Sequence, residues 1–127
     1  MKFKIDKNTF DNIATSMQPF LEKKDASNIT SHIYLEVLNN NLIIKSTDLE
    51  MGLKVQIDTI EQPIDGKATV NVANLLGILK RLKNDPIIIE VVDNNLIIKQ
   101  NSSKFKLPMY DANEYPLFPD NKMTHHL

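Results

Sequence analysis

The chain has 127 residues, of which 42% are hydrophobic and 24% are charged, a balance typical of one globular domain with a hydrophobic core. Its formal net charge of −1 excludes attraction of the whole molecule to a polyanion, so any contact with nucleic acid must be local. Without cysteine it has no disulfide, thiolate ligand or catalytic thiol. No apolar run reaches the roughly 18 residues of a membrane span, and we expect a soluble, cytoplasmic protein.

The chain begins with a predicted strand, Lys2 to Ile5, followed by a predicted amphipathic helix. Asn8 is the candidate N-cap of this helix, and Pro19 lies near its end. Apolar residues recur at helical spacing between these two positions: Phe10, Ile13, Ala14 and Met17. One face of the helix is therefore expected to pack on a core.

A ten-residue segment then occurs twice in the sequence. Residues 36–45 read EVLNNNLIIK and residues 90–99 read EVVDNNLIIK. Asparagine and aspartate tolerate left-handed backbone conformations, and the flanking residues favour strands, so each copy predicts a β-hairpin. Each hairpin is followed by another predicted strand, Leu53 to Ile57 in the first case and Lys104 to Leu107 in the second.

The elements before the second hairpin repeat those before the first. Residues 61–66 predict a turn, which leads into a strand from Lys67 to Val70 and a helix capped by Asn71. The apolar stripe of this helix comprises Val72, Leu75, Leu76, Leu79 and Leu82, and the basic residues near its negative end are Lys80, Arg81 and Lys83. Both halves, about 1–60 and 66–109, thus read strand, helix and three strands, which indicates a duplicated β-α-β-β-β unit.

The predicted strands alternate apolar and polar residues, which favours sheets with one buried and one wet face. Ile33, Leu35 and Val37 alternate with His32, Tyr34 and Glu36, for example. Two amphipathic helices can cover the buried faces, so we predict an α+β domain over residues 1–120, with the helices side by side on antiparallel sheets. Residues 121–127 lack a pattern and are expected to form a frayed tail.

With these motifs, the sequence resembles the bacterial sliding clamps, the beta subunits of DNA polymerase III. The resemblance covers roughly the first 120 residues and includes Met1 to Phe3, Thr47 to Met51, Ser103 to Leu107 and Tyr115-Pro116. It implies the N-terminal DNA-clamp domain of a ring that has helices inside and sheets outside. Clamp subunits have three such domains and pair head to tail, so the second and third domains are expected to be absent from this chain.

The resemblance further implies that double-stranded DNA passes through the ring, held by weak, nonspecific phosphate contacts. Lys24 matches a basic DNA-contacting position of the family, and Lys23 lies beside it. Lys80, Arg81 and Lys83 are further candidates. Alternatively, Lys23 and Lys24 lie in a solvated loop, and the three basic residues near the second helix cap its end.

A subunit interface is implied along the edge strand Ser103 to Leu107 and the nearby second helix, facing the third domain of a second clamp subunit. Phe105 and Leu107 match apolar interface positions, although packing in the domain's own core is the alternative. Asn74, which replaces a basic family residue, shares the helix face away from the core with Ile78. An exposed isoleucine there would require a covering partner.

The implied function is that of a DNA polymerase processivity factor, which meets DNA polymerase III and the clamp loader through the full-length protein. A stand-alone interaction module that uses its open edge strand is the alternative. We do not expect an enzyme, a metal site or a cofactor, because the acidic residues alternate faces and no nucleophile or phosphate-loop motif occurs. The candidates for such chemistry are Asp48, Glu50 and Asp58, together with His32, His125 and His126, and no metal is assigned to any of them.

Overall fold

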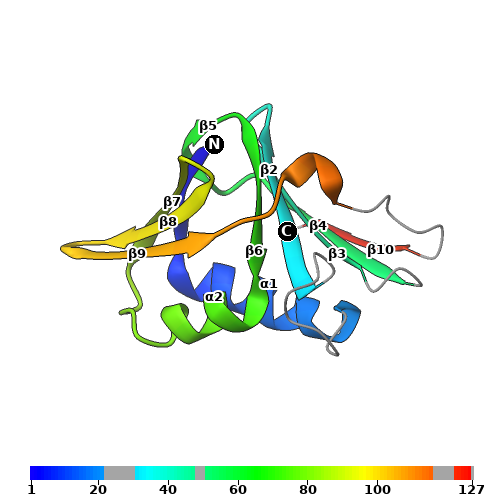
Figure 1. Cartoon of the computed structure of the whole chain (residues 1–127), viewed down its shortest axis with the longest axis horizontal. Helices are drawn as coiled ribbons and strands as arrows, with labels where there is room; N and C mark the ends of the chain where they lie inside the picture. Colours follow the sequence, from blue (N-terminus) through cyan, green and yellow to red (C-terminus); the bar gives the residue numbers. More distant parts are fainter. Residues whose placement is uncertain (22–30, 48–50, 116–121, 127) are drawn as a thin grey trace.

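The computed structural model describes the backbone of residues 1–21, 31–47, 51–115 and 122–126, and the side chains of the first three of these ranges. Two five-stranded sheets stand over two helices (Figure 1). Sheet A has the order β5 (Glu61–Ile64), β1 (Lys2–Asp6), β7 (Pro86–Val92), β8 (Asn95–Gln100) and β9 (Ser103–Pro108). Sheet B has the order β10 (Lys122–His126), β4 (Gly52–Ile57), β3 (Asn41–Thr47), β2 (His32–Leu38) and β6 (Gly66–Asn71).

Both predicted hairpins are confirmed. Asn39 and Asn40 join β2 to β3 with φ angles of 53° and 65°, and Asp93 and Asn94 join β7 to β8 with φ angles of 51° and 62°. Two successive residues at positive φ are typical of the two-residue type I′ turn, whose twist matches that of the strands. The register is equivalent in the two copies, and each hairpin lies at the centre of its own sheet.

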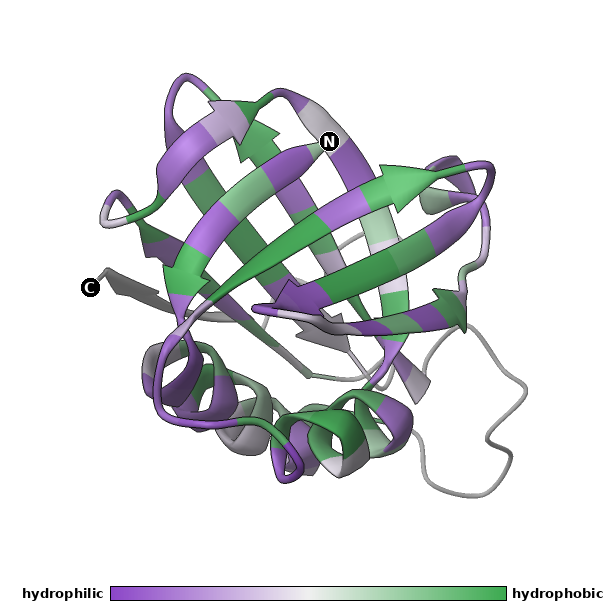
Figure 2. Cartoon of the chain, turned by 90° about the vertical axis from the view of Figure 1, so that its left-hand side faces the viewer, coloured by the Kyte–Doolittle hydropathy of each residue, from purple (hydrophilic) through white to green (hydrophobic). Residues whose placement is uncertain are grey.

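The helices α1 (Lys7–Met17) and α2 (Val72–Leu79) contact one another and lie side by side beneath the sheets (Figure 2). Asn71 is the N-cap of α2, as predicted. The N-cap of α1 is Asp6 rather than the predicted Asn8, because the Asp6 carboxylate accepts a hydrogen bond from the Thr9 backbone N–H at 3.2 Å. A short 3₁₀ helix, η1 (Gln18–Phe20), follows α1.

The end of α2 also differs from the prediction, because the apolar stripe continues to Leu82 while the helix ends at Leu79. Hydrogen bonds to the third preceding carbonyl tighten the chain at Arg81 and Leu82. Buried Gln100 then holds the following loop through hydrogen bonds to the backbone of Lys83. Leu82 therefore reaches the core from a turn.

Two further predictions are corrected by strand pairing. The expected turn at residues 61–66 contains the strand β5, which pairs antiparallel with β1 across an irregular register. The expected frayed tail contains β10, which pairs parallel with β4. In both cases the added strand satisfies backbone groups at a sheet edge, which local sequence patterns do not reveal.

The core lies between the inner faces of the sheets and the apolar stripes of the helices. Phe3 from β1 and Phe10 from α1 meet edge to face, with ring centres 6.0 Å apart. These side chains are fully buried together with Leu35 from β2 and Leu75 from α2. Within the described ranges, neither helix has the length and apolar character to cross a membrane.

Candidate DNA and subunit interfaces

The surface of α1 that faces away from the sheets is polar, and the only charge on it is the partly exposed carboxylate of Asp11. It exposes Asn8, Asn12, Thr15 and Ser16. The only lysine of the helix, Lys7, is buried, and its ammonium lies 3.8 Å from the Asp11 carboxylate. This surface therefore offers hydrogen-bonding groups but no free cation of its own.

The cations near α2 lie in the turn that follows the helix. Lys80, Arg81 and Lys83 are exposed, and none of them makes an ion pair with another described residue. Gln100 fixes this turn by accepting a hydrogen bond from the Lys83 backbone N–H at 2.8 Å. The structure thus brings three of the five predicted DNA-contacting residues together, while Lys23 and Lys24 lie outside the described residues.

The strand β9 forms one edge of sheet A and pairs only with β8 among the described strands. Phe105 and Leu107 point inward, where they are partly buried and pack against the core. Lys104 and Lys106 are exposed on the opposite face. Core packing and an interface are therefore compatible at Phe105 and Leu107, because the domain covers these side chains only in part.

The two predicted interface residues of α2 lie in different environments. Asn74 is exposed, as expected. Ile78 is half-buried and packs against the core, so its predicted position on the face away from the core is wrong. Ile78 lies three residues after Leu75, so it borders the apolar stripe of the helix, which ends one residue later.

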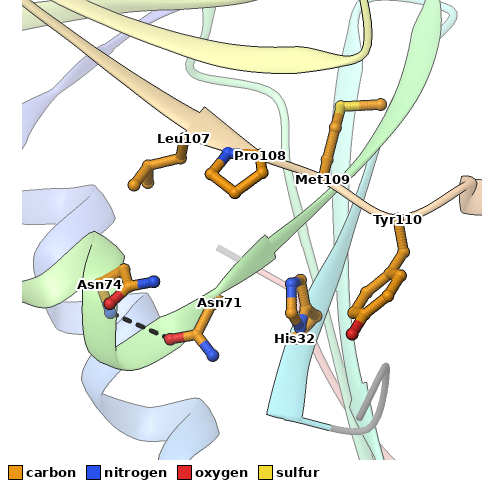
Figure 3. A pocket seen from close by; sticks show the side chains of 7 residues that line it. All are labelled: His32, Asn71, Asn74, Leu107, Pro108, Met109 and Tyr110. Carbon is orange, nitrogen blue, oxygen red and sulfur yellow. Dashed lines mark hydrogen bonds between the residues drawn. The ribbon is translucent and has the colours of Figure 1, made fainter. Parts of the chain in front are cut away.

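Asn74 and Leu107 meet at a cavity of about 300 Å³ between the start of α2 and the chain that leaves β9 (Figure 3). The cavity is lined by His32, Asn71, Asn74, Leu107, Pro108, Met109 and Tyr110. Phe105 and Ile78 do not line it. His32, Met109 and Tyr110 were not predicted as site residues, because only tertiary packing brings β2 against the segment after β9.

This segment continues across the outer face of sheet B and covers His32 and Tyr34, so the predicted wet face of β2 is wrong. The Tyr110 ring centre lies 4.7 Å from that of His32, and the Thr69 hydroxyl bonds both the N–H and the carbonyl of Tyr110. A short 3₁₀ helix, η3 (Ala112–Glu114), follows. Tyr115 then packs over Tyr34, with ring centres 5.5 Å apart.

The covered tyrosines are held in their neutral form. Burial and a 2.7 Å hydrogen bond to Glu36 raise the pKa of Tyr34 well above its ordinary value. Burial also raises the pKa of Tyr115, whose hydroxyl donates to the backbone carbonyls of His32 and Lys45. No group of three or more His, Asp or Glu side chains that could hold a metal ion occurs in the part of the chain described by the structure.

Comparison with known proteins identifies the family. Residues 1–119 match the family model described as the DNA polymerase III beta subunit, N-terminal domain. The beta sliding clamp of Helicobacter pylori strain J99 is 46% identical over 119 residues, which are 94% of this chain and 32% of the relative. The Pseudomonas putida beta sliding clamp is 32% identical over 97 residues, 76% of this chain and 26% of the relative.

Solved structures agree with this result. The crystal structure of the Helicobacter pylori beta clamp bound to a DNA ligase peptide matches with a TM-score of 0.88 at 46% identity, covering 94% of this chain and 33% of that one. The DNA polymerase III subunit beta of Pseudomonas aeruginosa matches with a TM-score of 0.86 at 27% identity, with the same coverage. This chain spans about a third of the length of the relatives it matches. It belongs to the family of the N-terminal domain of the DNA polymerase III beta subunit, the beta sliding clamp.

Proposed function

We propose that the chain acts as one domain of a DNA polymerase processivity factor, a ring that encircles duplex DNA. The observation that supports this proposal most strongly is the pair of helices side by side on one surface, with a polar face on α1 that has no exposed cation. A closed ring around DNA cannot fall off, so it needs no tight contacts with the duplex. A surface with few cations binds the phosphate backbone weakly and can therefore slide along it. The proposed role is non-catalytic and uses no cofactor.

The phosphate contacts are assigned to Lys80, Arg81 and Lys83 in the turn after α2, and to Lys23 and Lys24. The first three are exposed and have no ion-pair partner among the described residues, so their charge is available to DNA. Such contacts are independent of base sequence and weaken steeply with salt. We therefore expect no base-specific binding.

The subunit interface is assigned to β9 and the start of α2, where a third domain of a second clamp subunit would complete a head-to-tail dimer. An open strand edge presents unpaired backbone groups that another strand can satisfy. Phe105 and Leu107 carry partly buried apolar surface beside this edge, and Asn74 lies next to Leu107 at the cavity. The chain would meet DNA polymerase III and the clamp loader through the full-length protein.

Topological retention on DNA tests the ring. A full-length subunit that contains this domain is loaded by its clamp loader onto nicked circular DNA and separated from free protein by gel filtration. We expect the protein to remain with the circle and to be lost when the DNA is cut to a linear form. Equal retention on linear and circular DNA would contradict encirclement, because only a threaded ring distinguishes the two.

Charge substitution at the edge tests the interface. In the full-length subunit, Leu107→Asp places a charge on partly buried interface surface and is expected to weaken dimerisation by roughly a hundredfold or more. Sedimentation measures the dimer, and circular dichroism verifies that the domain stays folded. Ile64→Asp is the matched control, because Ile64 is 56% exposed on β5, at the opposite edge of the same sheet. Similar dimerisation of the two variants would refute the assignment.

A further inference from the structure

Lysines dominate the outer face of sheet A. Strand register places Lys4, Ile88, Lys99 and Lys104 in one row across four strands, and Lys2, Glu90, Ile97 and Lys106 in the adjacent row. Inward-pointing core residues alternate with these positions along each strand. We call the set Lys2, Lys4, Lys99, Lys104 and Lys106 the lysine face.

The charge of this face contrasts with that of the whole chain. Besides the five lysines, the register adds Glu61 on β5, Glu90 on β7 and Asp6 at the end of β1, which leaves two positive charges. The chain as a whole carries a formal charge of −1. Lys4 lies 3.8 Å from Glu61, and Lys99 binds Glu90. The remaining lysines, Lys2, Lys104 and Lys106, make no ion pair with a described residue.

The titration of Glu90 is consistent with a positive local potential. Its hydrogen bond to Lys99 lowers the pKa of the carboxyl below its ordinary value, burial opposes this shift, and the charges of Lys99, Lys2 and Lys104 add to it. A carboxylate held by several cations stays ionised. Cations that are not neutralised by such a partner remain available to anionic groups from outside the domain.

Apolar surface is interleaved with these charges. Ile97 is 5% exposed yet lies outside the main core cluster, on the same side of the sheet as the lysines, whose aliphatic stems can cover it. Ile64 and Val92, at the margins of the face, are 56% and 46% exposed. A matching partner would combine negative charge with apolar side chains.

We propose that the lysine face docks an acidic peptide segment of another protein that carries apolar residues between its carboxylates. Charge complementarity selects the acidic residues, and the exposed Ile64 and Val92 at the margins of the face accept the apolar ones. A nucleic acid fits less well, because no aromatic side chain for base stacking lies on this face among the described residues, and Glu61 and Glu90 repel phosphates. The inference does not depend on ring formation.

Amide chemical-shift mapping on the 127-residue chain tests the proposal with a synthetic peptide of alternating glutamate and valine. We expect shifts confined to β1, β7, β8 and β9, and binding that weakens as salt is raised. The double variant K2E/K106E should weaken binding roughly tenfold, because exposed ion pairs contribute up to about fivefold each. A peptide with glutamine in place of glutamate should likewise bind the unmodified chain roughly tenfold more weakly than the glutamate peptide does.

The matched control is the single variant Lys67→Glu, compared with Lys106→Glu. Lys67 is an exposed lysine on β6 of sheet B, so the substitution changes the net charge equally at a different surface. We expect full binding for Lys67→Glu and several-fold weaker binding for Lys106→Glu. Equal binding by the two variants, shifts that map to the helices, or tighter binding of a single-stranded oligonucleotide of the same charge would each overturn the proposal.

Discussion

The two hairpins of the duplicated unit use the same pair of charged residues in different ways. Glu36 and Lys45 in the first hairpin occupy the positions of Glu90 and Lys99 in the second. In the second hairpin Lys99 binds Glu90 directly. In the first, Glu36 accepts a hydrogen bond from the Tyr34 hydroxyl at 2.7 Å, and the Lys45 ammonium lies 5.3 Å from the centre of the tyrosine ring.

One position accounts for much of this difference. Tyr34 corresponds to Ile88, and each lies across the hairpin from its lysine. A tyrosine supplies a hydroxyl donor and a ring over which Tyr115 packs, so the outer face of sheet B is covered at this position by the chain's own later segment. Isoleucine supplies neither, and the outer face of sheet A stays exposed. The shared register positions the strands, while single side chains decide which sheet remains open to partners.

Truncation at these equivalent positions gives the largest expected difference. Tyr34→Ala should lower the free energy of unfolding by about 3–5 kcal/mol, as for other buried aromatic residues, because Tyr34 is only 7% exposed. Ile88→Ala should cost only about 1 kcal/mol, because Ile88 is partly exposed. Urea denaturation measures both. Equal losses would show that the two outer faces are equally covered.

Alkaline pH should reveal a smaller difference in stability, which comes from the covered tyrosines of sheet B. The pKa of Tyr34 and of Tyr115 is raised in the fold, so their stabilising effect is complete below the ordinary value of 10.0 and is lost as the pH rises above it toward the folded pKa. The free energy of unfolding should fall above pH 10.0 by up to about 1.4 kcal/mol per pH unit for each tyrosine.

Denaturation at a series of pH values measures this slope. Tyr34→Phe and Tyr115→Phe should each reduce it, because each removes one group that ionises more readily in the unfolded chain. Ile88→Phe is the matched control, since it changes the equivalent outer position of sheet A without removing a titrating group. A slope that stays unchanged in both tyrosine variants would contradict the closed face of sheet B.

Local patterns predicted the parts of the fold that form within short stretches of chain. The two hairpins and the Asn71 cap depend on neighbouring residues, and both predictions were correct. The strands β5 and β10 were missed because they depend on pairing with the distant strands β1 and β4. Burial of His32 was missed for the same reason, since its covering residue, Tyr110, lies far along the chain.

The candidate site was predictable to a similar extent. The exposed cluster after α2 follows from helix periodicity and charge, which are visible in the sequence. The cavity that joins Asn74 to Leu107 was not, because it is formed by elements from both sheets. Ile78 was misplaced because helix periodicity groups it with Asn74, whereas in the fold it packs against the core, a contact that only the tertiary structure reveals.

The smallest expected effect concerns Glu90 itself. Its pKa is lowered mainly by the hydrogen bond to Lys99, so this pair stabilises the fold above the ordinary carboxyl value of 4.5 and loses its effect as the pH falls through the folded pKa. Because the Lys99 side chain is 41% exposed and solvent screens the pair, the contribution should stay below about 1 kcal/mol. Lys99→Met should raise the pKa of Glu90 toward 4.5, as followed by carboxyl NMR during acid titration.

Lys104→Met is the graded control for this prediction. Lys104 contributes the weakest of the attractive charges at Glu90 and makes no hydrogen bond to it, so its removal should raise the pKa of Glu90 by less. Equal shifts in the two variants would mean that a diffuse field, rather than the direct bond to Lys99, holds Glu90 ionised. In the first hairpin Glu36 is held by the Tyr34 hydroxyl, and in the second Glu90 is held by Lys99. If the Lys99 bond did not hold Glu90, the two hairpins would differ only in the presence of the tyrosine.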